Sequence, residues 1–259
     1  MRVHGTNIET KINNNYNGRE KELRKFKQQF YEPMRSRVET FDLTTGRHIF
    51  VILSDILNDY REKLHSFAKR YNIKSQSKFE SSFLEEISYY LFHRLDVIQS
   101  QKLSIFNKGI YAGLKINEDL SIDVIKKDVD FCIGKKVVIT IEQQSPITLI
   151  IPAVSVEVKT YLDATMFGEI KSSSKTLKSA TPNSKAYVLL GYKCIADEHI
   201  LAARQDATLD EIFVLQNHEG DKIDADTLYD YYKEIENTLS SITNPPTITV
   251  PGRLLKFID

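Results

Sequence analysis

A carboxylate and a lysine stand one residue apart at the end of an apolar run near the middle of the chain. The segment Ala153–Asp163 reads AVSVEVKTYLD, and its alternating valines predict a buried β-strand. Side chains alternate between the two faces of a strand, so Glu157 and Lys159 point the same way and the valines point the other way. A second carboxylate, Asp130, stands at the start of an earlier apolar strand, within KKDVDFCIGKK. These three side chains are the candidates for chemistry.

The three residue types together fit metal-assisted hydrolysis of a phosphodiester. Carboxylates from two neighbouring strands could hold a hard divalent cation, which takes oxygen ligands from carboxylates, water and phosphate. A lysine beside that cation could orient an attacking water and offset the charge that develops. The competing interpretation is an ion pair between Glu157 and Lys159 on a half-exposed strand. Asp128 competes with Asp130 as the first acid, and we favour Asp130 because the residues after it enter the core directly.

The surrounding sequence predicts an α/β fold in which helices precede and follow a mixed sheet. Apolar residues at helical spacing predict helices over 18–34, 48–71, 77–95, 163–179 and 224–242, the first broken near Pro33. Segments rich in Val and Ile predict strands over 121–126, 129–134, 136–142, 147–151, 153–159, 186–192 and 211–215. The segment GIYAG, from Gly109, is interpreted as a turn, and Asp163 is expected to cap the helix that follows it.

No repeat, low-complexity tract or linker divides the sequence, so we expect a single α/β domain over residues 1–259. Within that domain, 1–76 would form a mainly helical N-terminal part and 77–216 the catalytic core. Residues 217–259 would form a C-terminal helix and a proline-bearing tail.

Composition narrows the class of protein. The 259 residues are 41% hydrophobic and 27% charged, as in an ordinary globular protein. The formal net charge is zero, but the stretch from Lys171 to Lys193 holds five lysines and no acid. Two distant cysteines indicate neither a disulfide framework nor a zinc site. No glycine-rich nucleotide-binding motif, signal peptide or membrane span is evident, so we expect a cytoplasmic protein without a membrane partner.

The motif resembles the PD-(D/E)xK nuclease superfamily. Asp130 matches the first acid, and Glu157 and Lys159 match the (D/E)xK element, with Val129 in place of the proline. The sequence further resembles type II restriction endonucleases of the BbvCI/DdeI-like kind through the blocks SSFLEEISYYLF, VDFCIG, SVEVKTYLDATMFGEIKSSSKTLK and DEIFVLQ. This resemblance covers about residues 77–216.

The resemblance implies a sequence-specific, Mg²⁺-dependent endonuclease of a restriction-modification system that cuts double-stranded DNA. Asp130 and Glu157 would hold Mg²⁺, and Lys159 would position or help deprotonate the attacking water. Two alternatives stay open: a structure-directed repair or recombination nuclease of the same fold, and a non-catalytic DNA-binding subunit. One such site per chain predicts a homodimer, or a heterodimer with a related subunit, for a double-strand break.

The helix expected over 77–95 offers a further acid. Glu80 falls inside its apolar arc and Glu86 at the edge of that arc, where a carboxylate is costly unless it is paired or bound to metal. The resemblance implies that Glu86 or Glu80 joins the metal site, with a structural salt bridge as the alternative. Glu85 projects opposite the apolar face, and we expect it in solvent.

The helix after Asp163 presents a row of lysines. Lys171, Lys175 and Lys178 share its outer side, where they would contact DNA phosphates or simply be solvated.

Overall fold

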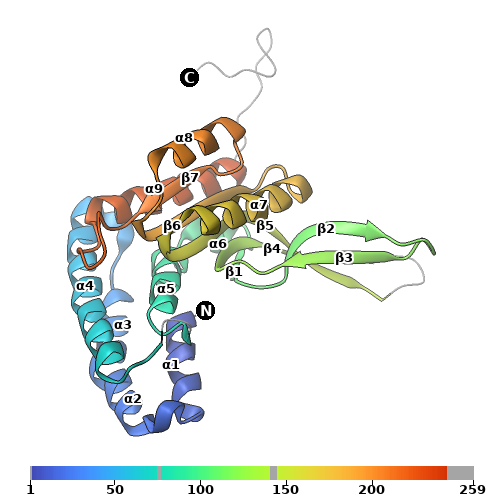
Figure 1. Cartoon of the computed structure of the whole chain (residues 1–259). Coiled ribbons are helices and arrows are strands. Elements are labelled where there is room, and N and C mark those ends of the chain that lie inside the picture. The colour runs from blue at the N-terminus through green and yellow to red at the C-terminus, as the bar shows by residue number, and fades with distance from the viewer. Residues whose placement is uncertain (1, 75–76, 141–144, 244–259) are drawn as a thin grey trace.

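The computed structural model of the chain describes residues 2–74, 77–140 and 145–243 (Figure 1). The proline-bearing tail expected after the last helix lies outside these residues. The helices are α1 (Val3–Asn13), α2 (Glu20–Phe26), α3 (Glu32–Val38), α4 (Arg47–Arg70), α5 (Ser81–Phe92), α6 (Asp96–Ser100), α7 (Ala164–Ala180), α8 (Asp197–Asp206) and α9 (Ala225–Thr243). None of them, within the described residues, has the length and hydropathy that a membrane span requires.

The strands form a mixed five-stranded sheet and a separate two-stranded ribbon. They are β1 (Ser104–Phe106), β2 (Ile110–Ile116), β3 (Ile122–Lys127), β4 (Phe131–Ile139), β5 (Ile147–Leu162), β6 (Lys185–Lys193) and β7 (Glu211–Val214). The large sheet has the order β1-β4-β5-β6-β7, and β2 pairs with β3 in the ribbon. β4 is antiparallel to β1 and β5, whereas β6 is parallel to β5 and β7. The predicted α/β class with a mixed sheet flanked by helices is thus confirmed.

The sheet is buried on both faces, as its apolar central strands require. Along β6, Tyr187 and Leu189 join the core beneath α5 and α9. Val188 and Leu190, which point the other way, join the core beneath α7 and α8. The N-terminal helices pack beyond α5, so the first core continues from the sheet into the helical part (Figure 1).

β4 and β5 are longer than the sequence predicts, because two expected interruptions are absorbed into the strands. The segments expected over 129–134 and 136–142 form one strand as far as Ile139, and those over 147–151 and 153–159 form another. Gly134 lies opposite Pro152, next to a register shift at Ile133. A side chain at position 134 would meet the backbone oxygen of Ile151 at 2.5 Å, so glycine permits this close approach.

Two further expectations are wrong. The first helix does not break near Pro33: a π-helical turn, η2 (Lys27–Tyr31), joins α2 to α3, and Pro33 stands in the first turn of α3. The π turn directly precedes the proline, and in it the Glu32 N–H bonds to the Lys27 carbonyl five residues back. The helix therefore continues through Pro33 although the proline has no N–H to donate. The segment from Gly109 is not a turn, since Ile110–Ile116 is strand β2 with a bulge between Tyr111 and Gly113.

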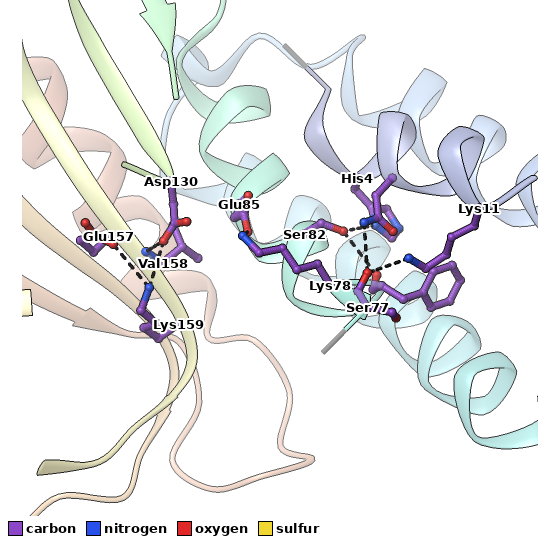
Figure 2. Close-up of polar contacts among 12 residues, drawn as sticks. His4, Lys11, Ser77, Lys78, Ser82, Glu85, Asp130, Glu157, Val158 and Lys159 are labelled. Carbon is purple, nitrogen blue, oxygen red and sulfur yellow. Dashed lines mark hydrogen bonds and ion pairs between the residues drawn. The ribbon is translucent and has the colours of Figure 1, made fainter. Parts of the chain in front are cut away.

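Buried polar contacts hold the N-terminal helix α1 on α5 and α4. The ring nitrogens of His4 lie 2.9 Å from Ser82 Oγ and 2.7 Å from the Tyr60 hydroxyl (Figure 2 shows the first contact). His4 is fully buried, and this burial, followed by the charge of Lys11, lowers its pKa from 6.5 to about 3. The folded protein therefore holds His4 neutral.

We expect the free energy of unfolding to fall as pH drops below 6.5, because the unfolded chain then binds a proton at His4 that the folded chain excludes. The His4 contribution is fully present above pH 6.5 and is about 2 kcal/mol smaller at pH 5. Urea unfolding at pH 7.5 and 5.0 measures this loss. The decline should be smaller in His4→Gln and unchanged in His199→Gln, an exposed histidine. Equal declines in all three proteins would contradict the assignment.

Candidate active site

Asp130, Glu157 and Lys159 meet at the point where β4 begins and β5 nears its end (Figure 2). The Lys159 Nζ atom lies 3.3 Å from Asp130 Oδ2 and 3.4 Å from Glu157 Oε2. The backbone N–H of Val158 donates a hydrogen bond to the same Asp130 oxygen at 2.9 Å. The structure therefore brings together the three residues that the sequence singled out.

The pairing of β4 with β5 produces this arrangement. The register sets Phe131 opposite Val156, so Asp130, one residue earlier, comes beside Glu157. The valines of β5 hold the strand in place, because Val154 and Val156 are completely buried in the core on the opposite face. Asp128, the rival acid, is exposed and accepts a hydrogen bond from the Gly109 N–H at 3.0 Å, outside this cluster.

Helix α7 supplies a hydroxyl that the sequence analysis did not assign to the cluster. Ser173 is buried, and its Oγ donates to Glu157 Oε1 at 3.3 Å. The start of α7 is fixed by Asp163, whose Oδ1 accepts the Met166 N–H at 2.8 Å, which confirms the predicted cap. The cap sets where α7 leaves the sheet and so which of its residues reaches Glu157.

Glu85 is the main correction to the sequence analysis, because it is buried rather than in solvent. Its Oε1 lies 3.8 Å from the Lys78 ammonium, and the two side chains point toward the Asp130 cluster (Figure 2). A cavity of about 190 Å³ is lined by Lys78, Glu85, Asp130 and Lys159, among other residues. Helix α5 lies between the N-terminal helices and the sheet, so its less apolar side faces the site and not water. A signal for this exists in the sequence: Phe92, two turns after Glu85, falls on the same side of α5, so that side is not a fully polar one.

The electrostatics of the cluster are those of crowded negative charge. Burial, followed by the neighbouring charge of Asp130, raises the pKa of Glu85 to about 7. The same two causes raise the pKa of Glu157. Burial alone would lower the pKa of Lys159, but Asp130 and Glu157 outweigh it and raise that pKa above its ordinary value. Lys159 is thus a stable cation among carboxylates.

Glu86 and Glu80, the two acids expected at the metal site, have other partners. Glu86 is completely buried and accepts hydrogen bonds from the Gly5 N–H at 3.0 Å, the Tyr31 hydroxyl at 2.8 Å and the Tyr90 hydroxyl. Glu80 Oε1 lies 2.9 Å from His65 Nδ1 near the surface. Glu80 thus has the kind of partner that the salt-bridge alternative expects, whereas Glu86 is held by uncharged hydrogen-bond donors. Neither arrangement supports a metal ligand.

The lysines of α7 differ in their surroundings. Lys178 Nζ lies 2.7 Å from Asp210 Oδ2 and donates to the Ala207 carbonyl at 3.0 Å. Lys175 is exposed, and Lys171 lies over the Phe167 ring at 5.9 Å. The three lysines line one shallow hollow on the surface.

The donor set suits a cation that takes few protein ligands. Within the described residues, no three His, Cys, Asp or Glu side chains form a complete metal-binding group. Mg²⁺ does not need one, since it usually binds one or two carboxylates and keeps water or phosphate oxygens for its other positions. Asp130 and Glu157 fit that requirement.

Comparisons with known proteins show the fold and the family of the chain. No curated protein matches the chain. Among solved structures, the native BbvCI A2B2 tetramer superposes with a TM-score of 0.75 at 18% identity, over 94% of this chain and 97% of that one. The similarity shows that the two proteins share a fold. The sequence profile described as Bpu10I restriction endonuclease matches residues 76–240, a span that holds Glu85, Asp130, Glu157 and Lys159. Since this match spans well over half of the sequence, the chain belongs to the Bpu10I restriction endonuclease family.

Proposed function

We propose that the chain is the Mg²⁺-dependent catalytic subunit of a type II restriction endonuclease, which hydrolyses phosphodiester bonds of double-stranded DNA at Asp130, Glu157 and Lys159. The observation that carries this proposal is the contact of Lys159 with both carboxylates, within the segment that the family profile matches. Restriction endonucleases typically use a divalent metal ion, and Mg²⁺ is the ion that fits this donor set best.

Asp130 and Glu157 would hold the ion, and Glu85 takes the place that the sequence analysis gave to Glu86 or Glu80. Support for Glu85 comes from its burial and from its position in the same cavity as Asp130. Three carboxylates beside two ammonium groups, Lys159 and Lys78, leave excess negative charge, which a divalent cation would balance. When bound, Mg²⁺ supplies Lewis-acid stabilisation of the phosphoryl oxygens and makes water a better nucleophile.

Lys159 acts as a cation, not as the base. Its Nζ is held by two carboxylates and keeps its proton, so it donates hydrogen bonds to the attacking water or to a phosphate oxygen. Of the two roles open from the sequence, positioning is therefore favoured over deprotonation. Ser173 holds one Glu157 oxygen and leaves the other facing Lys159.

A double-strand break needs two cuts on antiparallel strands, and one cluster cuts one strand at a time. We therefore propose that the chain works with at least one further subunit, either a second copy or a related chain. The fold that it shares with BbvCI occurs there in an A2B2 tetramer, which supports a multi-chain assembly.

Replacing Asp130, Glu157 or Lys159 by Ala should reduce plasmid cleavage at least about a hundredfold, because loss of either carboxylate removes a ligand of the proposed Mg²⁺ and loss of Lys159 removes a cation that offsets charge in the transition state. DNA binding measured with Ca²⁺ in place of Mg²⁺ should persist. Asp128→Ala, an exposed acid two residues from Asp130, is the matched control and should cut normally. Sequenced ends should identify one site, whereas smearing would indicate a structure-directed nuclease. Near-normal cutting by Lys159→Ala would restore the simple ion-pair interpretation.

Glu85→Gln should unfold at a higher temperature than the wild type at pH 8 and at the same temperature near pH 4.5. The raised pKa means that the wild type loses stability as pH rises from 4.5 to about 7, on the order of 2 kcal/mol, because the folded site then holds an unfavourable charge. The variant lacks that charge, so it should also cut more slowly and gain less stability from Ca²⁺.

Glu86→Gln is the comparison for Glu85. It should unfold at a lower temperature at both pH values, since three hydrogen bonds to the carboxylate are weakened. If Glu86→Gln instead abolished the stabilisation by Ca²⁺ and Glu85→Gln preserved it, Glu86 would be the ligand after all.

Removing the charge of Lys171 or Lys175 should lower the salt dependence of DNA affinity by about one unit of slope for each phosphate that the protein no longer neutralises. Fluorescence anisotropy over a salt series, in Ca²⁺, measures the slope. Lys178→Ala should chiefly lower the unfolding temperature, because Asp210 loses a partner. Lys69→Ala, an exposed lysine of α4, is the control. Unchanged slopes for Lys171→Ala and Lys175→Ala would mean that both lysines are simply solvated.

A further inference from the structure

The β2–β3 ribbon projects away from the helices and the main sheet and carries an exposed apolar face (Figure 1). The register pairs Leu114 with Val124 and Ile116 with Ile122, so these four side chains share one face. Leu114 is 50% exposed and Ile116 is 70% exposed. Leu120, in the connecting turn, is 79% exposed in a left-handed backbone conformation.

Such a ribbon needs a partner. A two-stranded hairpin is only marginally stable by itself, and an exposed apolar face on a projecting element usually marks an interaction surface. Val138 and Ile139 add exposed apolar surface at the end of β4, which projects in the same direction (Figure 1).

The charges of the ribbon are distributed unevenly along its length. Glu118 and Asp119 are exposed at the tip, whereas the root exposes Lys108 and Lys126 together with one acid, Asp128. Between them, Lys115 and Asp123 lie opposite each other, so their charges offset. Lys126 lies two residues beyond Val124 on the same strand, so it shares the apolar face. DNA is a poor occupant, because an acidic tip repels phosphates and this face has few donors for base edges.

We propose that the ribbon is a self-association surface, on which the ribbons of two copies of this chain pack antiparallel about a two-fold axis. Antiparallel packing places Glu118 of each copy beside Lys126 of the other, with the leucine and isoleucine side chains between them. Parallel packing would oppose like charges. The zero net charge of the chain adds no long-range repulsion. The inference rests on the proposed multi-subunit function and assigns a surface to one contact within it.

The apolar part is tested by sedimentation velocity on the full chain, without DNA or metal. The wild type should form dimers in a concentration-dependent manner. Leu114→Thr/Ile116→Thr keeps residues that favour strands but removes most of the apolar surface, so it should weaken association at least about tenfold. Circular dichroism checks that the variant is folded.

The antiparallel geometry is tested by charge reversal. Glu118→Lys alone and Lys126→Glu alone should each weaken association, because each opposes like charges. A mixture of the two single variants should recover dimers, since opposite charges then face each other at both contacts. The double variant Glu118→Lys/Lys126→Glu should recover them by itself. Lys69→Glu, at an exposed lysine of α4, changes the net charge as Lys126→Glu does and should have no effect.

Three results would overturn the inference: a wild type that stays monomeric at its highest soluble concentration, dimers that the threonine variant leaves unchanged, or a mixture that does not recover. If the threonine variant still sedimented as a dimer but bound DNA more weakly, the ribbon would be a DNA-binding surface, and that result would also overturn the inference. Cleavage assays test the nuclease proposal independently of this inference, because sedimentation without DNA does not depend on cleavage. Glu157→Ala should sediment as the wild type does.

Discussion

The crowding of three wholly or partly buried carboxylates, Asp130, Glu157 and Glu85, is the constraint on which the proposed site depends. Asp130 and Glu157 both contact Lys159 Nζ, and burial together with the nearby charge of Asp130 raises the pKa of Glu85. Two ammonium groups, Lys159 and Lys78, do not balance three carboxylates, so the cluster is least stable when all three are ionised. A divalent cation would remove that conflict, which supports the proposed metal site. The hydrogen bond from the Val158 N–H to Asp130 keeps this carboxylate next to Glu157 and Lys159 despite the repulsion.

Helix α5 transmits the packing of the N-terminal helices to this cluster. Its adjacent acids face different environments. Glu85 lines the same cavity as Asp130, whereas Glu86 accepts hydrogen bonds from the Gly5 N–H and the Tyr31 hydroxyl. A methyl group at Gly5 would clash with the Tyr31 hydroxyl. Glycine at this position therefore lets α1 pack closely against Tyr31. The first 76 residues, for which the sequence indicated no chemical role, therefore determine where Glu85 sits.

The central strands and the Asp130–Glu157–Lys159 cluster were predictable because both depend on local pattern. Alternating valines fix which face of β5 carries Glu157, and that alternation is visible in the sequence. The position of Glu85 was not predictable from helical periodicity, because that pattern assumes one buried face, and α5 is buried on two. The sequence pattern did not indicate helix α1 for a similar reason. Its buried positions include His4, Gly5 and Lys11, and the two polar side chains can be buried only because partners distant in the chain form hydrogen bonds with them. Ser173 reaches Glu157 through the path of α7, which no local pattern specifies.

The ribbon and Asp130 are linked by a few residues of chain. Asp128 accepts the Gly109 N–H at the root of the ribbon, and Asp130 follows two residues later. The root also packs on the body, where Ile110 and Ala112 of β2 meet Leu177 of α7. The root of the ribbon thus contacts β4 and α7, the two elements that pack beside Glu157. A partner bound to the ribbon would act on both elements. A subunit contact rooted beside Asp130, the acid proposed to hold the metal ion, would therefore link assembly to the arrangement of the proposed site.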